Sequence, residues 1–550
     1  MAVESGEAVI RDAVEESAAD VPLARKELLL QTLRILVPTD VSSLLWMSTQ
    51  TITLYYVGKC HRTLGTAQYS ASIIIFNMCA FSIIMGFGAA IDTLSSQAFG
   101  ADPKSTEVGE TLQMALALNF TLGVVFSIFF MNSRPMMCAL FDADVCDGVA
   151  KFLRYAPLYL FAQIISGVMS KTMYAQKLPE VVAVANAVAA LSSPLANHFL
   201  TPLGIHGAAL ALGAAVGLCS LTHILFAIFH PKAIIRCAPW PSPKLRSLAA
   251  WRLFFRVGVP ALVATCAEWW AFEIQTVIAA KISTSALAVH GVAMNLVGLL
   301  FSISVGMSVA ASVIVGNSLG AGKPRQARQF AYFVLVCDVG LGLVTAVVML
   351  LFGSHIARFY GAEDDVITGV RSIIPLVALC HAGDSVQFCL QGVFRGAGRP
   401  TQAGVAVLLT LWCVGVPASV LFVFVLHIGV YGCIGGIVVG MCCEIPLLCW
   451  WMRKFDWSVL ATEARTLQGL PSAATDVAMV DSFDSEAADV CGHTHTRSSS
   501  VSSHHSHASH CVRTTAKGEY ERELHERTPS ILEEACCSLH NSFAMPPRGI

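Results

Sequence analysis

Charged side chains are scarce in this chain. They make up 13% of its 550 residues, whereas hydrophobic side chains make up 55%, and the mean hydropathy is +0.64. Soluble globular domains have about 25% charged residues, so this chain has too little polar surface to cover a soluble globule of its size. We therefore predict a protein that is embedded in a lipid bilayer.

Other features that would indicate a function are also missing. The formal net charge is only −2, which gives no reason to expect a nucleic-acid partner. The 19 cysteines lack the spaced pairs of a zinc site, and we interpret most of them as small apolar fillers. No nucleophile, metal-ligand or phosphate-loop pattern is present, so we expect no enzyme activity, no metal and no cofactor. Residues 1–23 carry acidic residues where a cleaved signal would have an apolar run.

Twelve apolar segments lie between Leu28 and Trp451, six in each half of the chain. Each is long enough for the roughly 20 residues that cross a hydrocarbon core. Because six crossings return the chain to its starting side, both halves insert in the same orientation, and the axis that relates them lies along the membrane normal. The predicted fold is an all-α polytopic membrane protein with twelve transmembrane helices in two six-helix repeats related by a pseudo-two-fold. The predicted segments are residues 28–57, 66–99, 110–131, 149–172, 181–203, 207–230, 251–281, 286–317, 327–353, 370–395, 401–426 and 429–452.

The repeat is visible in the sequence itself. Residues Gly86–Ala101 read GFGAAIDTLSSQAFGA, and Gly306–Ala321 read GMSVAASVIVGNSLGA, 220 positions later. A further match, Arg34–Pro38 with Arg256–Pro260, has nearly the same offset. A membrane domain that is built twice is typical of transporters, and we expect the binding site to lie between the copies.

Basic residues indicate the orientation. The connection between the sixth and seventh segments contains Lys232, Arg236, Lys244 and Arg246 without an acidic residue, and such connections stay in the cytosol. Both termini are therefore predicted to be cytosolic, in the plasma membrane or in the membrane of an acidic internal compartment. The predicted parts are an acidic cytosolic N-terminal tail (1–27), the N-lobe (28–230), a cytosolic inter-lobe linker (231–250), the C-lobe (251–453) and a disordered Ser/His-rich cytosolic tail (454–550).

Acidic residues inside apolar segments are the main candidates for a site, because an ionisable side chain near the bilayer centre costs about 2.5 to 3.5 kcal/mol. Glu268 and Asp384 lie near the middle of the seventh and tenth segments. If both face one cavity, desolvation and mutual repulsion favour their protonated forms, as in a proton-coupled carrier. Alternatively, each acid supports a helix break or a neighbouring side chain. Glu273 lies about 140° around the helix from Glu268, so we expect the two carboxylates to face different surfaces.

The first half has two such acids. Asp92 either binds a cation or stabilises the conformation at the end of the second segment. Asp40 lies two residues after Pro38, and because proline leaves a backbone carbonyl without its helical hydrogen bond, the local structure needs a polar partner there. Aromatic rings near the acids offer a planar cation a face to stack on, although aromatics on membrane helices are often lipid-facing or structural. The remaining candidates for a substrate cavity are Trp269, Trp270, Phe301, His290, Asn295, Gln391 and Asp40.

Four motifs together resemble the multidrug and toxic compound extrusion (MATE) family, and more closely its eukaryotic branch. They are Asp92–Ala101 (DTLSSQAFGA), Glu268–Glu273 (EWWAFE), Val315–Gly322 (VGNSLGAG) and Gln391–Gly398 (QGVFRGAG), and the resemblance covers residues 28–453. It implies a two-lobe carrier that exports organic cations or other xenobiotics in exchange for protons, or in some members for sodium.

The resemblance also implies roles for individual residues. Glu268 corresponds to the main cation and proton site of the family, and Asp384 to the acid of its tenth segment. Phe301, His290 and Asn295 depart from the family pattern on the eighth segment, which leaves the substrate open. We expect a monomer that binds small organic cations. The rivals are a sodium-coupled exporter, a lipid-linked oligosaccharide flippase and a receptor or scaffold that works through its tail.

Overall fold

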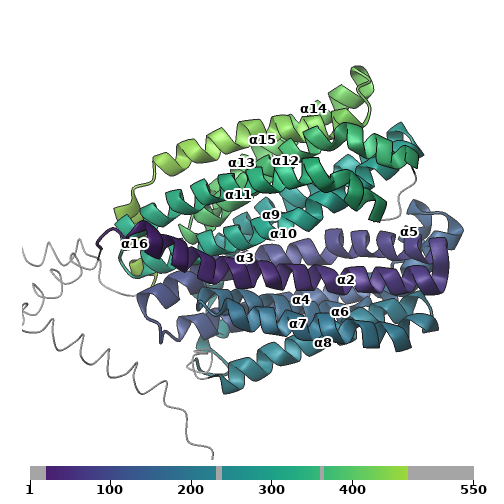
Figure 1. Ribbon diagram of the computed structural model, residues 1–550. Helices are drawn as coiled ribbons and strands as arrows, with labels where there is room; N and C mark the ends of the chain where they lie inside the picture. Colours follow the sequence, from purple (N-terminus) through teal and green to yellow (C-terminus); the bar gives the residue numbers. More distant parts are fainter. Residues whose placement is uncertain (1–19, 231–237, 360–363, 469–550) are drawn as a thin grey trace, which may run out of the picture. The chain divides into compact units, whose positions relative to one another are not determined.

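The computed structural model describes residues 20–230, 238–359 and 364–468, which form helices joined by short connections, without a β-strand (Figure 1). In chain order the elements are α2 (Arg25–Phe76), η1 (Asn77–Phe81), α3 (Ser82–Ala101), α4 (Glu107–Met131), α5 (Arg134–Leu140), α6 (Ala143–Ala175), α7 (Pro179–Leu200), η2 (Thr201–Leu203), α8 (Ile205–Phe229), η4 (Pro243–Arg246), α9 (Leu248–Ile282), α10 (Thr284–Gly320), α11 (Pro324–Phe359), α12 (Asp364–Gly396), α13 (Pro400–Val407), η5 (Leu408–Gly415), α14 (Val416–Val420), η6 (Leu421–Val425), α15 (Val430–Arg453) and α16 (Trp457–Leu467).

Twelve helical segments within the described residues are long and apolar enough to cross a membrane. Each overlaps one of the twelve predicted segments, and the predicted all-helical membrane fold is confirmed. Helices suit this environment because every backbone N–H and C=O must find a partner where there is no water. The first two spans are continuous in α2 except at Arg62, whose φ of 55° and ψ of −152° break the helical path.

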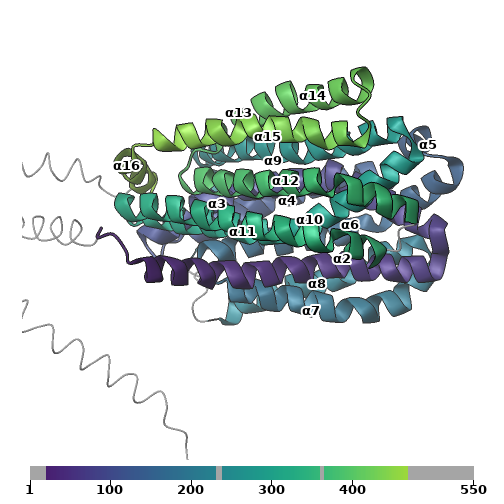
Figure 2. The same ribbon diagram turned by 45° about the horizontal axis from the view of Figure 1, so that its top comes forward.

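Helices α2–α8 of the N-lobe group together, and α9–α15 of the C-lobe lie beside them (Figures 1 and 2). The lobes meet mainly where α3 contacts α9 and α10, and where α2 contacts α10. A β-carbon on Gly100 of α3 would lie 2.1 Å from the carbonyl oxygen of Asn317, and one on Gly320 of α10 would lie 1.9 Å from that of Gln97. Only glycine permits such an approach. These are the same contact seen from each repeat, as a two-fold relation requires.

Part of the predicted disordered C-terminal tail (454–550) is helical. Residues 457–467 form helix α16, which lies against α10 and α11. Asp456 caps the helix, since its Oδ1 accepts the backbone N–H groups of Ser458 and Val459. An apolar stripe at helical spacing attaches α16 to the lobe, whereas the rest of the predicted tail, from residue 469, lies outside the described residues. The buried residues of α16 are Trp457, Leu460, Ala461 and Ala464.

The end of the predicted N-terminal tail is bound to the C-lobe. The carboxylate of Asp20 accepts the backbone N–H groups of Arg325 at 3.0 Å and of Gln326 at 3.1 Å, at the start of α11. The backbone of Leu23 exchanges two hydrogen bonds of 2.8 Å with the side-chain amide of Gln329. Free N–H groups at a helix start favour a carboxylate, so this acidic residue has a structural role. Residues 1–19 lie outside the described part.

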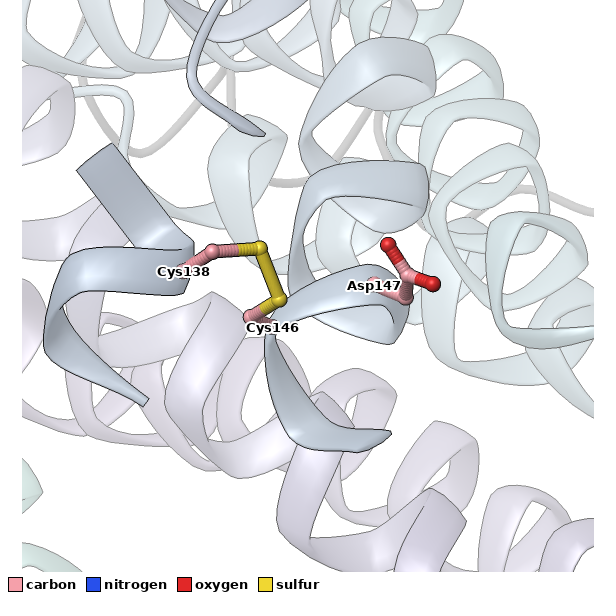
Figure 3. Close-up of side chains that lie close together, drawn as sticks. All are labelled: Cys138, Cys146 and Asp147. Carbon is pink, nitrogen blue, oxygen red and sulfur yellow. A yellow bond between two sulfur atoms is a disulfide. The ribbon is translucent and has the colours of Figure 1, made fainter. Parts of the chain in front are cut away.

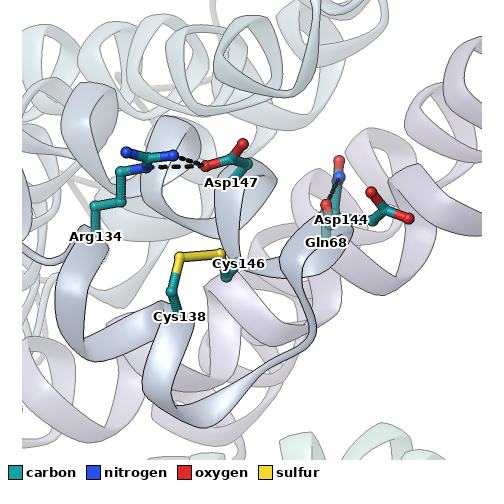
Figure 4. Close-up of a disulfide and its surroundings, with 6 residues drawn as sticks. All are labelled: Gln68, Arg134, Cys138, Asp144, Cys146 and Asp147. Carbon is teal, nitrogen blue, oxygen red and sulfur yellow. Dashed lines mark hydrogen bonds and ion pairs between the residues drawn. A yellow bond between two sulfur atoms is a disulfide. The ribbon is translucent and has the colours of Figure 1, made fainter.

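Two cysteines depart from the expectation of apolar fillers. Cys138 of α5 and Cys146 of α6 form a disulfide (Figure 3). The carboxylate of Asp147 lies close to both sulfur atoms, but disulfide sulfurs are not the thiolates that bind metal. Asp147 instead pairs with Arg134 at 2.9 Å (Figure 4). The disulfide therefore joins the short helix α5 to the start of α6.

Candidate functional site

Glu268 is buried near the middle of α9, and its side chain is 2% exposed. The helix starts at a cap in which Ser247 Oγ accepts the backbone N–H of Ala250 at 3.3 Å. Gln387 Nε2 of α12 donates a hydrogen bond to Glu268 Oε1 at 3.1 Å. Glu268 Oε2 has no partner among the described residues. A buried oxygen without a partner favours the binding of a proton or a cation.

Asp384 comes from α12 and is 3% exposed. Its Oδ1 also lacks a partner among the described residues. Asp384 and Glu268 line the same cavity, which has a volume of about 250 Å³. The structure therefore brings together the two acids that the sequence singled out. The lining residues come from α9, α10 and α12 of the C-lobe; they are Glu268, Trp269, Phe272, Glu273, Thr276, Met294, Val297, Gly298, Phe301 and Asp384.

Glu273 lines this cavity together with Glu268, so the expectation that the two carboxylates face different surfaces is wrong. The cavity follows α9 for more than two turns, from Glu268 to Thr276. A wall of that length and width accommodates positions that are far apart around the helix. Glu273 is half-buried and lies one and a half turns further along α9, which gives the cavity a third carboxyl group.

Aromatic rings connect the cavity to its surroundings. The ring of Trp269 lies 5.5 Å from that of Phe81 in the N-lobe, and Phe81 stacks on Trp46 at 5.7 Å. On the other wall, the ring of Phe301 lies 5.0 Å from that of Phe388. Pairs at these distances and angles stabilise one another. All lining residues of the cavity belong to the C-lobe, so the cavity lies within one copy of the repeat rather than between the copies, and Trp269 links it to the N-lobe through Phe81 and Trp46.

Several candidates lie away from the cavity wall. His290 is fully buried elsewhere on α10, and neither ring nitrogen has a partner among the described residues. Asn295 is exposed and donates to the backbone carbonyl of Gly291. Trp270 is half-buried, but the neighbouring Trp269 is the one that lines the cavity. These three residues face surroundings other than the cavity, so we do not retain them as cavity residues.

Asp40 and Asp92 lie where the lobes meet. The carboxylate of Asp40 packs directly against α10 at Gly306, where a β-carbon would lie 1.7 Å from Asp40 Oδ1. Asp92 Oδ2 accepts Lys171 Nζ at 2.7 Å and lies 3.6 Å from Arg395 Nε of the C-lobe. Because Asp92 already has two basic partners, the geometry favours its structural alternative over a free cation site.

Further contacts join Arg395 to both lobes. Its backbone carbonyl accepts Thr93 Oγ1 of α3 at 2.6 Å, and its Nη2 donates to Ser308 Oγ of α10 at 2.7 Å. The guanidinium lies over the ring of Phe388, 5.4 Å from its centroid, and its charge also acts on Glu268. Arg395 therefore joins the end of α12 to α3 of the N-lobe and to α10 of the C-lobe.

Two buried acids of the C-lobe were missed at the sequence level. Asp338 of α11 and Glu444 of α15 are both 0% exposed. Ser385 Oγ donates to Asp338 Oδ1 at 3.0 Å, and Thr410 Oγ1 donates to Glu444 Oε2 at 3.1 Å. The signal that identified Glu268, an acid inside an apolar segment, was present for both. Gln391, the remaining candidate, is buried beside Glu268 and Glu444 rather than on the cavity wall.

Comparison with known proteins identifies relatives of the chain. The family model described as MatE matches residues 38–198 and 260–421. Protein DETOXIFICATION 48 of Arabidopsis thaliana is 27% identical over 442 residues, which cover 78% of this chain and 81% of the relative. Multidrug and toxin extrusion protein 1 of Homo sapiens is 27% identical over 401 residues, 72% of this chain and 69% of the relative. The crystal structure of the eukaryotic MATE transporter AtDTX14 superposes with a TM-score of 0.74 at 23% identity, over 80% of this chain and 98% of that one.

Proposed function

The chain belongs to the MatE family of membrane transporters, and on this premise we propose that it is a secondary active antiporter that exports organic cations in exchange for protons. The observation that carries the proposal is the burial of Glu268 and Asp384 on the wall of one cavity. Buried carboxyl groups are stable when they hold protons or when a positive guest balances their charge. Protons and cations therefore compete for the same place.

Organic cations suit this cavity for two reasons. Glu268, Asp384 and Glu273 supply negative charge, and the rings of Trp269 and Phe301 supply faces over which a positive group is attracted. The cavity of about 250 Å³ has room for a small planar ion or one part of a larger one. We infer that the positive charge of the guest contributes most to its selection by the site. The flat apolar surface of the guest contributes second.

The exchange follows from this competition. Protons taken up by Glu268 and Asp384 neutralise the cavity and release the bound cation on the outer side. The lobes then reorient, the protons leave to the cytosol, and the restored negative charge binds a cytosolic cation. Reorientation requires the contacts of Arg395 with Asp92 and Thr93 to separate, because these join the two lobes at one end.

We propose that this joined end faces the cytosol. It is the end of α3, α10 and α12, near the basic connection in which Lys244 pairs with Glu107 of α4. Helix α4 runs from that connection toward α5, so the disulfide of Cys138 and Cys146 lies at the opposite end. Disulfides persist in oxidising compartments, which supports the same orientation, with cytosolic termini, in a plasma membrane or an acidic internal membrane.

Transport into everted or reconstituted vesicles tests the proposal. The probe is ethidium, a planar monocation, and the drive is an imposed pH gradient or an imposed sodium gradient in turn. We expect uptake with the pH gradient that is lost in Glu268→Gln and Asp384→Asn at unchanged protein level. Glu180→Gln, an exposed acid of α7, is the matched control and keeps the wild-type rate.

The outcomes separate the alternatives. Uptake that follows only the sodium gradient would assign sodium as the coupling ion. Retained proton-driven uptake in Glu268→Gln would refute the role of Glu268. A flippase of lipid-linked oligosaccharides would need positive groups for phosphates, whereas this cavity is lined by three carboxyl groups; movement of such a lipid with no movement of ethidium would favour that rival.

A further inference from the structure

Glu444 is a buried acid that the proposed exchange at the cavity wall does not use. It lies on α15 with 0% of its side chain exposed, and it is not part of the cavity wall. Its Oε2 accepts Thr410 Oγ1 at 3.1 Å, whereas its Oε1 has no partner among the described residues. A buried carboxyl group with one free oxygen has the same unsatisfied character as Glu268.

Glu444 is electrostatically part of the cavity site. Helix α15 packs against α12 and α9, the helices that carry Asp384 and Glu268, and all three acids are buried there, so that negative charge on one disfavours ionisation of the others. Gln391 of α12 lies beside both Glu268 and Glu444. The amide nitrogen of Gln391 has no hydrogen-bond partner among the described residues, like Glu268 Oε2 and Glu444 Oε1, and a primary amide has two N–H donors that two carboxylates can accept once they ionise. The three acids therefore form one cluster, in which the protonation of each depends on the other two.

Positive charge near the cluster is limited. Among the described residues Glu444 takes part in no ion pair, and Arg395 is the basic group whose charge acts on Glu268. Helices α13, η5, α14 and η6, which also pack against α15, carry no acidic or basic residue, and α10 carries His290 outside the cavity. Three carboxylates in this low-dielectric region would repel one another strongly. Some of them must hold protons, and a bound cation changes how many.

We propose that Glu444 is a second proton-binding carboxyl group of the exchange cycle, which loses its proton together with Glu268 when a cation enters the cavity. In this step two carboxyl O–H bonds break, both protons leave to solvent, and the charges of the cation and of Arg395 balance the two carboxylates. Glu444 thus replaces Asp384 as the holder of the second exchanged proton, which revises the exchange cycle proposed above on this point. Asp384, on which the charges of Glu268, Glu444 and Asp338 all act, keeps its proton in that state. The inference rests on the proposed cation–proton exchange and specifies where its second proton is held.

The test measures the protons released by the purified full-length protein in detergent when ethidium binds, by calorimetry in buffers of different ionisation enthalpy. We expect about two protons per ethidium for the wild type and about one for Glu444→Gln. Removal of one negative neighbour also moves the pH of half-maximal ethidium binding lower, by about one unit. A purely structural role of Glu444 changes neither quantity, and such a result would overturn the inference.

Asp338→Asn is the matched comparison, because Asp338 is equally buried and acts on Asp384, whereas no interaction joins it to Gln391 or Glu268. We expect the wild-type proton count for Asp338→Asn; an equal loss in both variants would contradict the assignment to Glu444. If ethidium binds to the wild type without proton release, the proposed function itself fails.

Infrared difference spectra between about pH 5 and about pH 9 need no substrate. They should show one protonated-carboxyl band fewer in Glu444→Gln, and an unchanged spectrum would refute the proposal even for a variant that binds ethidium poorly.

Discussion

The side-chain hydroxyl of Ser312 lies 3.5 Å from the backbone carbonyl oxygen of Asp92, the residue that stands 220 positions earlier in the chain. The two occupy the same position in the two repeats. In a two-fold arrangement, a position contacts its own counterpart only next to the axis. A β-carbon on Gly316 would likewise lie 2.1 Å from Ser96 Oγ, again 220 positions earlier. The axis that relates the lobes thus passes between α3 and α10, beside the ion pairs of Asp92.

The first prediction concerns the glycines that flank this axis. Gly100→Ala and Gly320→Ala place a β-carbon about 2 Å from opposing backbone oxygens, and overpacking of this kind costs about 1 to 3 kcal/mol. We expect each variant to lower the thermal unfolding midpoint in detergent and to slow ethidium transport, with similar effects because the two positions are related by symmetry.

The control for this pair is Gly217→Ala on α8, where a β-carbon would meet nothing within 4 Å. It should leave the midpoint unchanged or raise it, since alanine is the better helix former by about 1 kcal/mol. A Gly100→Ala variant as stable as Gly217→Ala would contradict the close approach of α3 and α10.

The second prediction concerns the charges at Asp92. Asp92→Asn leaves both Lys171 and Arg395 without their carboxylate, whereas Lys171→Met leaves Asp92 with Arg395 still 3.6 Å away. The side chains of Lys171 and Asp92 are only 15% and 14% exposed, and loss of one partner of a buried pair costs about 3 kcal/mol. We expect Asp92→Asn to destabilise the protein more than Lys171→Met, in chemical or thermal unfolding.

Arg134→Met provides the contrast, because Arg134 and Asp147 are 68% and 48% exposed and exposed pairs contribute about 1 kcal/mol or less. The double variant Asp92→Asn/Lys171→Met should recover part of the stability that Asp92→Asn loses. No recovery would show that the Lys171 contact does not depend on charge.

The third prediction separates two neighbouring tryptophans. Trp269 lines the cavity and Trp270 does not, although both are equal candidates on sequence grounds. A cation over an aromatic face gains about 0.5 to 2 kcal/mol, so Trp269→Ala should raise the KM for ethidium about 2-fold to 30-fold, and Trp270→Ala should raise it much less. Concentration series of transport in vesicles measure this, and equal changes would place the guest elsewhere.

The sequence predicted the features that depend on local chemistry. Span lengths follow from apolar runs, and Glu268 and Asp384 stood out because acids are costly in such runs. Arg395 illustrates the limit: in the sequence it is only the last residue of the predicted segment 370–395, but the structure buries it between Phe388 and Asp92. That contact joins helices from different lobes, and no local pattern encodes it. The pairing of Cys138 with Cys146 is equally invisible, because spacing alone does not fix disulfide connectivity.

The last prediction uses that disulfide to establish the orientation. Connections rich in Lys and Arg lie in the cytosol, which places the end of the protein with Lys244 there. Helix α4 crosses from that end to α5, so Cys138 lies on the other side. After mild reduction of intact cells or sealed vesicles, a membrane-impermeant maleimide should label Cys138 and Cys146 only from the side opposite the cytosol. The background variant replaces the exposed Cys60, Cys413, Cys442 and Cys443 by serine, and the further variant Cys138→Ser/Cys146→Ser gives the signal that must be subtracted. Labelling of the pair from the cytosolic side would reverse the proposed orientation, and with it the direction in which protons and cations are exchanged.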